Sequence, residues 1–178
     1  CNPQMHGIIS DYWFDRLKSV RVGSIEDENV KTLEGKSKFI QASPHRLLGS
    51  TIGDELKNSY QKSKVIAIGL EPNSAVLCGG HKADYVLWMD TYNGNWVTSS
   101  FYRNQLPDWL MRYNEKKYAD TYTAKVWAPL LPLSEYTESR ADNNKFEKGF
   151  NLKNDFPYEI EKLKDKSEEY RIILSTPY

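Results

Sequence analysis

The chain has 178 residues, which fits one ordinary domain able to bury roughly 70 % of its unfolded surface. Its 24 basic residues balance its 24 acidic residues, which argues against nucleic acid polymers and anionic membranes as general partners. The absence of an apolar run of about eighteen residues predicts no membrane span. Twelve tyrosines and five tryptophans suit half-buried sheets, clefts and interfaces.

The first half of the chain predicts alternating helices and strands. Residues 6–16 indicate a loop that enters a strand. Residues 43–60 carry apolar side chains at steps of three and four, which predicts a helix with Ser43 as its N-cap and Pro44 at its first position. Residues 65–70 form a continuous apolar run, which is typical of a strand covered on both faces.

The middle of the chain predicts a β-hairpin. Residues 74–78 indicate one helical turn that ends at a pair of glycines, and residues 85–89 indicate a second apolar strand. The dipeptide Asn93-Gly94 is a strong signal for a two-residue turn, and residues 96–98 return from it.

The last third of the chain predicts a helix followed by irregular structure. Residues 106–113 indicate an amphipathic helix, and the chain beyond residue 118 is rich in Pro, Asn, Ser and charge, which is typical of a long surface excursion. Residues 159–170 predict a charged helix, and residues 171–174 a final strand. The fold class expected from this order is α/β, or α+β with an inserted irregular lobe.

Catalytic and metal-binding motifs are absent from the sequence. His6, His45 and His81 form no close pair of the kind that binds zinc, and each is best interpreted as a structural histidine. There is no nucleophile elbow and no phosphate-binding loop, and the apolar neighbours of Cys78 favour an inert thiol. We therefore predict no catalytic residue and no metal ligand in this chain, so that any chemistry it serves is completed by residues outside it.

The first residue, Cys1, allows two interpretations. The chain is either a processed lipoprotein anchored at that cysteine or an internal portion of a longer protein. The two cysteines are too few to define a disulfide framework.

Seven segments in a fixed order resemble one protein family. Each segment carries a short motif that is weak evidence alone, but the seven motifs in this order are specific. The segments are residues 3–9, 13–16, 43–48, 51–57, 63–66, 79–84 and 96–109. Together they resemble the bacterial branch of the alkaline phosphatase superfamily that groups with type I phosphodiesterases and nucleotide pyrophosphatases. The resemblance covers essentially the whole chain and favours the internal-portion interpretation of Cys1.

The resemblance implies a fold, an activity and a location. We expect residues 1–178 to be one internal portion of an alkaline phosphatase-like α/β core, with an inserted α+β cap lobe over approximately residues 85–158. Family members of this kind are periplasmic or secreted hydrolases of small phosphoric esters, and they use two zinc ions and a Thr or Ser nucleophile. The family's zinc ligands and nucleophile fall outside these residues, so we expect this chain alone to bind no zinc and to be inactive, and its exposed strand edges could let it self-associate.

Three positions in the chain correspond to substrate-binding residues of the phosphomonoesterase members. The family's Asn after the His-Gly-Ile motif corresponds to Asp11, and its Lys-x-Arg pair corresponds to Glu71 and Asn73. An ionised carboxylate cannot donate a hydrogen bond, and two carboxylates beside a phosphate dianion cost about a few kcal/mol each unless a cation intervenes. The resemblance therefore predicts an enzyme that is not a phosphomonoesterase of the Lys-x-Arg type.

Several alternatives remain open from the sequence. The parent enzyme could act on a phosphodiester, with Asp11 and Glu71 facing a hydroxylated or cationic group. Alternatively, the register slips in these loops, and Glu71 and Asn73 form a solvated turn around Pro72. Two further hypotheses are a noncatalytic ligand- or partner-binding pseudoenzyme module, and a relative of the sulfatases and phosphonate hydrolases.

Overall fold

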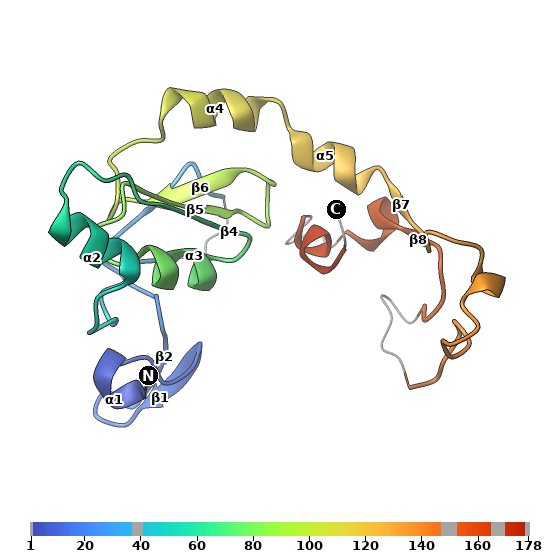
Figure 1. Cartoon of the computed structure of the whole chain (residues 1–178), viewed down its shortest axis with the longest axis horizontal. Helices are drawn as coiled ribbons and strands as arrows, with labels where there is room; N and C mark the ends of the chain where they lie inside the picture. The colour runs from blue at the N-terminus through green and yellow to red at the C-terminus, as the bar shows by residue number, and fades with distance from the viewer. Residues whose placement is uncertain (1, 37–40, 147–152, 165–169, 177–178) are drawn as a thin grey trace.

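The computed structural model describes residues 2–36, 41–146, 153–164 and 170–176 (Figure 1). Its main body is a four-stranded mixed sheet with the strand order β3-β6-β5-β4. The strands are β3 (Thr32–Leu33), β4 (Ile66–Gly69), β5 (Tyr85–Met89) and β6 (Trp96–Ser99). Strand β4 is parallel to β5, whereas β6 is antiparallel to both of its neighbours. This α/β arrangement agrees with the fold class expected from the sequence.

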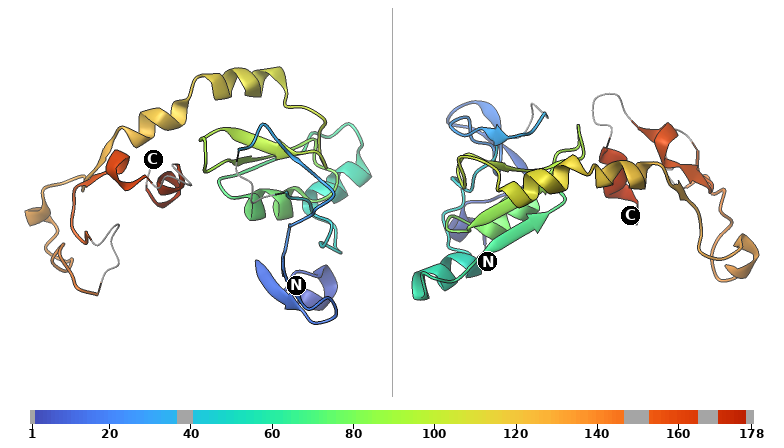
Figure 2. Two further views of the ribbon diagram at one scale, coloured as in Figure 1. Left: turned by 180° about the vertical axis from the view of Figure 1, so that it is seen from behind. Right: turned by 90° about the horizontal axis from the view of Figure 1, so that it is seen from above.

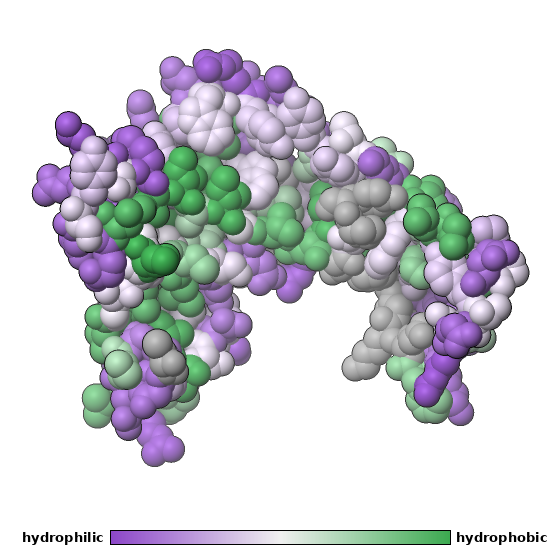
Figure 3. Space-filling view, in the orientation of Figure 1, coloured by the Kyte–Doolittle hydropathy of each residue, from purple (hydrophilic) through white to green (hydrophobic). Residues whose placement is uncertain are grey.

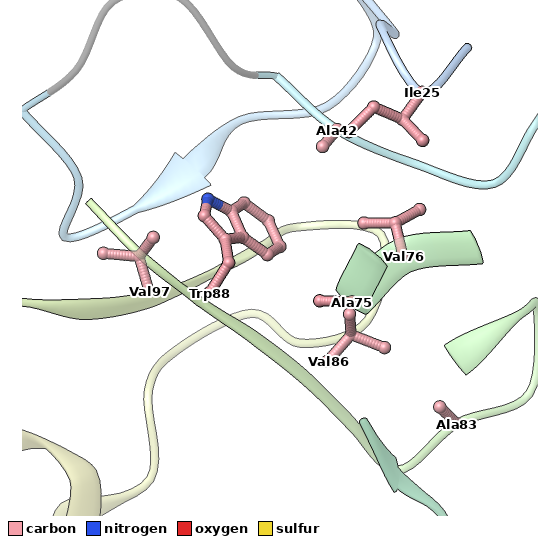
Figure 4. Packing of buried hydrophobic residues seen from close by; sticks show 8 residues of the cluster. All are labelled: Ile25, Ala42, Ala75, Val76, Ala83, Val86, Trp88 and Val97. Carbon is pink, nitrogen blue, oxygen red and sulfur yellow. The ribbon is translucent and has the colours of Figure 1, made fainter. Parts of the chain in front are cut away.

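Helices cover the two faces of β5. On one face, helix α3 (Pro72–Gly79) connects β4 to β5, and its Ala75 and Val76 pack with Val86 and Trp88 of β5 (Figure 4). On the other face, Leu110 of helix α4 (Asp108–Glu115) packs against Leu87. Alternate side chains of β5 thus enter two separate cores, which explains why the whole run of residues 85–89 is apolar.

Strand β4 is covered on one face only in the described part of the chain. Ala67 packs into the core beside α3, but Ile66 and Ile68, which point the other way, are 54 % and 61 % exposed. The prediction of a strand at this position is confirmed, and the prediction that both of its faces are covered is wrong for the described residues. Apolar residues gather on the sheet body below α4 (Figure 3).

The remaining elements flank the sheet. They are α1 (Pro3–His6), β1 (Tyr12–Asp15), β2 (Val20–Gly23), α2 (Ile52–Ser59), α5 (Tyr118–Thr123), β7 (Val126–Trp127), η1 (Leu133–Glu135), β8 (Tyr158–Glu159), η2 (Ile160–Leu163) and η3 (Arg171–Ser175). The hairpin of β1 and β2 lies at one end of the molecule, and α4 and α5 lead in succession to the segments around β7 and β8 at the other (Figures 1 and 2).

The helix expected over residues 43–60 begins later than predicted. Helix α2 starts after Thr51, which forms a capping box with Asp54: the Asp54 N–H donates to Thr51 Oγ1 (3.1 Å) and the Thr51 N–H donates to Asp54 Oδ2 (2.9 Å). Ser43 is not a helix cap, because it is buried and its hydroxyl donates to the carboxylate of Asp27. The capping box, rather than the Ser-Pro pair, therefore sets the start of the helix.

The β5–β6 hairpin is confirmed, but its turn is longer than predicted. The Asp90 N–H donates to the carbonyl of Asn95 (2.8 Å), and the Gly94 N–H donates to the carbonyl of Asp90 (2.8 Å). Of the turn residues only Gly94 has a positive φ, of 69°, so Asn93-Gly94 is part of a wider loop and not a two-residue turn.

Two predictions near the C-terminus are wrong. Residues 171–174 form the 3-10 helix η3 and not a strand, with the Ile173 N–H donating to the carbonyl of Tyr170 (3.1 Å). The helix expected over residues 159–170 is not formed in the described residues. Glu159 ends the two-residue strand β8, and the 3-10 helix η2 follows it. Residues 165–169 lie outside the described part. Apolar runs of four residues do not distinguish these conformations.

The expected lobe over residues 85–158 includes strands that belong to the main sheet. Strands β5 and β6 lie in its centre, and the chain leaves the sheet only after β6. The boundary of a substrate-facing cap lobe therefore stays a prediction.

Candidate functional site

The structure brings Asp11 and Asn73 together. Asp11 lies in the loop between α1 and β1, where its carbonyl accepts a hydrogen bond from the Ser24 N–H (2.8 Å). Asn73 is in the first turn of α3. Its Nδ2 donates to Asp11 Oδ1 at 2.9 Å, although the two residues are 62 positions apart in sequence. Two of the three residues predicted to contact substrate are thus direct neighbours.

Glu71 directly precedes α3 in the chain, two residues before Asn73. We call the region of Asp11, Glu71 and Asn73 at the end of β4 the corner. Glu71 is the N-cap residue of α3, but its exposed side chain makes no capping hydrogen bond. Its carbonyl accepts the Ala75 N–H (3.2 Å), and Pro72 supplies the fixed φ that suits the first helical position. The helix therefore forms without using the Glu71 carboxylate, which remains available to a ligand.

The turn that carries Glu71 is tight. A Cβ atom at Gly69, the last residue of β4, would meet the Ala75 nitrogen at 3.0 Å and the Glu71 carbonyl oxygen at 3.2 Å. The close approach of strand and helix at this glycine fixes Glu71 and Asn73 at the carboxyl end of β4. Ligands of open α/β sheets commonly bind at such strand ends.

The corner is rich in hydrogen-bond acceptors. Neither Asp11 nor Glu71 takes part in an ion pair within the described residues, and the Asn73 amide already donates to Asp11. Two carboxylates can accept hydrogen bonds from hydroxyl groups or contact a cation, but they cannot donate to phosphoryl oxygens. The two carboxylates therefore suit a neutral or cationic part of a ligand better than a phosphate dianion.

The histidines at positions 45 and 81 accompany buried aspartates. His45 Nδ1 lies 3.2 Å from Ser43 Oγ and 3.7 Å from Asp27 Oδ2. Burial lowers the pKa of His45, and the nearby charge of Arg46 lowers it further. These contacts with Ser43 and Asp27 suit a structural role, which stays a prediction for this histidine.

Asp54 holds the loop that contains His81. Its Oδ1 accepts the N–H groups of His81 (2.9 Å) and Lys82 (2.7 Å), while its Oδ2 accepts the Thr51 N–H. Burial alone would raise the pKa of Asp54, but these hydrogen bonds outweigh it and lower the pKa below its ordinary value. His81 Nδ1 is 3.5 Å from Asp54 Oδ2, so this imidazole also lies against a carboxylate with a structural task.

No group of three His, Cys, Asp or Glu side chains converges to hold a metal ion among the described residues. The thiol of Cys78 is exposed, which overturns its interpretation as a residue in apolar surroundings. In the same part of the chain, no helix has the length and apolarity needed to cross a bilayer.

Sequence reasoning missed a group of aromatic residues near the corner. Tyr113, Tyr118 and Tyr122 of α4 and α5 line a hollow of about 240 Å³, together with Leu70, the neighbour of Glu71 in sequence. Tyr118 and Tyr122 are four residues apart, so a helical interpretation of residues 118–123 would have placed them on one face.

Comparisons with known proteins extend over almost the whole chain. An alkaline phosphatase PhoV of Synechococcus elongatus is 34 % identical over 98 % of the chain, and an alkaline phosphatase PafA of Elizabethkingia meningoseptica is 32 % identical over 99 %. A protein of Myroides odoratus named calcium-transporting ATPase is 35 % identical over 98 %. The chain spans about a third of the length of these relatives (32 %, 33 % and 32 %, respectively). No protein-family model matches the chain.

Solved structures agree with the sequence comparisons. The crystal structure of wild-type PafA superposes with a TM-score of 0.84 at 29 % identity and covers 98 % of this chain, which corresponds to 33 % of the PafA chain. A PafA variant with one Thr, one Asn, one Lys and one Arg replaced also has a TM-score of 0.84, at 31 % identity.

Proposed function

Because the chain belongs to the alkaline phosphatase superfamily, we propose that it forms the substrate-facing part of a metal-dependent phosphoric ester hydrolase. The single observation that carries this proposal is the 2.9 Å hydrogen bond from Asn73 to Asp11, beside Glu71 at the end of β4. It supports a common site for three residues that the family register assigns to substrate binding.

The proposed substrate class is a phosphodiester. A diester carries one negative charge where a monoester carries up to two, so it needs fewer donors and tolerates the Asp11 and Glu71 carboxylates better. The carboxylates would face a hydroxylated or cationic part of the ester. We do not assign a catalytic residue within this chain.

The proposed metal content is two zinc ions in the longer protein. The described residues do not fit a zinc site, since no three potential ligands converge. As the family resemblance implies, the ligands and the nucleophile would come from other parts of that protein, and this chain alone would be inactive. We further propose a periplasmic or secreted location and self-association of the isolated chain through its exposed apolar surface.

Kinetics of the full-length protein test the proposal. We expect bis(p-nitrophenyl) phosphate to be hydrolysed with a higher kcat/KM than p-nitrophenyl phosphate, and Glu71→Ala to alter that preference. Glu55→Ala is the matched control, because Glu55 is an exposed residue of α2, and it should leave the preference for the diester unchanged. Faster turnover of the monoester together with no effect of Glu71→Ala would refute the assignment of Glu71.

The loss of the basic clamp also favours a second candidate, a noncatalytic binding module. Glu71 and Asn73 replace Lys and Arg, as they could after catalysis had been lost. Zinc analysis of the full-length protein separates the candidates, because the hydrolase requires about two bound zinc ions per chain and the binding module requires none.

A further inference from the structure

A hollow of about 240 Å³ lies between the sheet and the helices that leave it. Its lining residues belong to the segment just after β4, the β5–β6 hairpin, helices α4 and α5 with the residue that joins them, and η3. Most of the lining side chains are apolar or aromatic, and they include Trp96 and the tyrosines at positions 113, 118 and 122. We propose that this cavity binds a planar aromatic group of the ester substrate, an inference that rests on the proposed function.

The walls of the cavity are held in place by specific contacts. Asn114 of α4 bridges the backbone of Trp96, accepting from its N–H (2.9 Å) and donating to its carbonyl (2.8 Å). Lys117, which joins α4 to α5, donates from Nζ to Asn95 Oδ1 (2.8 Å). Helix α4 and the start of α5 are thereby fixed to the hairpin, so the aromatic side chains are presented by a constrained scaffold.

Close packing also fixes the hairpin tip. A Cβ atom at Gly94 would lie 2.6 Å from the Ala119 Cβ and 2.9 Å from the Tyr170 ring. The tip therefore packs against α5 and Tyr170, and both Gly94 and Ala119 line the cavity.

The aromatic lining indicates the chemistry of the ligand. The rings of Tyr113 and Tyr118 are 4.9 Å apart between centroids and inclined by 47°, and both side chains are partly exposed. Exposed rings arranged in this way offer stacking and edge contacts to another ring. An engineered apolar cavity of roughly 150 Å³ binds benzene, so this cavity has room for a one- or two-ring group.

The position of the cavity links it to the candidate substrate site. Leu70 lines the cavity and directly precedes Glu71 in sequence. The Met89 N–H donates to the Leu70 carbonyl (3.3 Å), which extends the pairing of β4 with β5 up to the cavity wall. In the proposed complex, the phosphorus of the ester lies near Glu71 and its aromatic ring enters the cavity that Leu70 lines.

The test uses the full-length protein and two diesters with the same leaving group, phenyl p-nitrophenyl phosphate and methyl p-nitrophenyl phosphate. We expect kcat/KM for the phenyl ester to exceed that for the methyl ester at least tenfold. Tyr118→Leu should reduce the ratio to about threefold or less, whereas Tyr118→Phe should retain it, because the ring and not the hydroxyl makes the contact. Tyr60→Ala, which removes an exposed tyrosine after α2, is the control and should keep the wild-type ratio.

Binding measurements keep the inference separate from the proposed activity. Calorimetric titration with phenylphosphonate and methylphosphonate should show at least tenfold tighter binding of the phenyl compound to the wild-type protein. If neither diester is hydrolysed but this difference appears and Tyr118→Leu abolishes it, the hydrolase proposal fails and the aromatic site stands. Equal binding of both phosphonates, or an unchanged ratio in a folded Tyr118→Leu variant, overturns the aromatic site.

Discussion

Asn73 donates a hydrogen bond to Asp11 and so ties the first turn of α3 to the loop before β1. Neither partner can offer a positive charge to a phosphate. We predict that Glu71→Lys combined with Asn73→Arg raises the ratio of monoester to diester kcat/KM at least about tenfold, because two cationic donors stabilise a dianion more than a monoanion.

The control for this double variant carries the same charge change elsewhere. Glu55→Lys with Gln61→Arg adds equal positive charge at exposed positions of α2 and the loop after it. Steady-state assays on both ester types should show no change of ratio for this variant. An equal rise in both double variants would mean that general electrostatics, and not the corner beside α3, determines the preference.

Asp84 joins three segments of the main body. Its Oδ2 accepts the Val65 N–H at the entry to β4 (2.8 Å) and contacts Lys57 Nζ of α2 (2.9 Å), and its side chain is only 11 % exposed. We predict that Asp84→Ala lowers the free energy of unfolding by about 2–3 kcal/mol, because a buried donor loses its charged acceptor. Urea unfolding of the full-length protein measures this.

Lys64 provides the matched control for Asp84. It lies 3.6 Å from Asp84 Oδ1, but its side chain is 80 % exposed. Lys64→Ala should change stability by less than about 0.5 kcal/mol, since solvent screens exposed ion pairs. Comparable losses from Asp84→Ala and Lys64→Ala would contradict the assignment of the stabilisation to the buried contacts.

The same carboxylate predicts an acid dependence of stability. Burial of Asp84 acts to raise its pKa, but the Val65 N–H and Lys57 outweigh this effect and lower the pKa to about 2 from its ordinary value of 3.8. Its stabilisation is therefore fully present above about pH 4 and is lost as the pH falls toward 2. Thermal unfolding between pH 5 and 2 should show a smaller acid loss in Asp84→Ala than in the wild type, and parallel curves would disprove this origin.

Gly80 occupies a position that no other residue fits well. Its φ is 67°, and a Cβ atom there would overlap the Asp54 carboxylate and lie 2.5 Å from Thr51 Oγ1. Gly80→Ala should therefore destabilise the protein by about 2–3 kcal/mol, through backbone strain and disruption of the capping box. Urea unfolding again provides the measurement.

A second glycine separates steric strain from the general effect of adding a methyl group. At Gly49 the nearest atom to a Cβ is the His6 Cβ, at 3.8 Å. Gly49→Ala should be neutral within about 0.5 kcal/mol or slightly stabilising, because it restricts the unfolded chain without a clash. Similar destabilisation by both substitutions would contradict the steric explanation.

The sequence predicted those elements whose pattern is determined locally. Strand β5 is apolar at every position because Val86 and Trp88 face α3 while Leu87 faces α4. Strand β4 has the same appearance, yet Ile66 and Ile68 are exposed in the described chain. Composition of a short run shows that a strand is apolar, but it cannot show which neighbouring element covers each face.

The errors arose where distant residues decide local structure. Ser43 is paired with Asp27, 16 positions away, so it was not available as a helix cap. The segment beginning at Arg171 turns as a 3-10 helix, with Ile173 buried beside Met89. Contacts of this kind depend on tertiary structure and have no periodic signature in the sequence.

The candidate site was predicted by matching positions in this sequence to the motifs of the family, and not from the residue types themselves. Asp11 and Asn73 are 62 positions apart, and nothing in their local sequence indicates that they meet. The cavity beside Leu70 was not predicted, because Tyr118 and Tyr122 lie in a stretch that was interpreted as irregular, whereas α5 is helical.

At the N-terminus of α3, the residue that starts the helix differs from the residue whose carboxylate is available to a ligand. Pro72 starts the helix, and the Glu71 side chain takes no part in capping it. Exchange of the side chain at position 71 thus leaves the core of the sheet and the helix start intact. A change of charge or size at position 71 is therefore compatible with an unchanged set of core-packing residues.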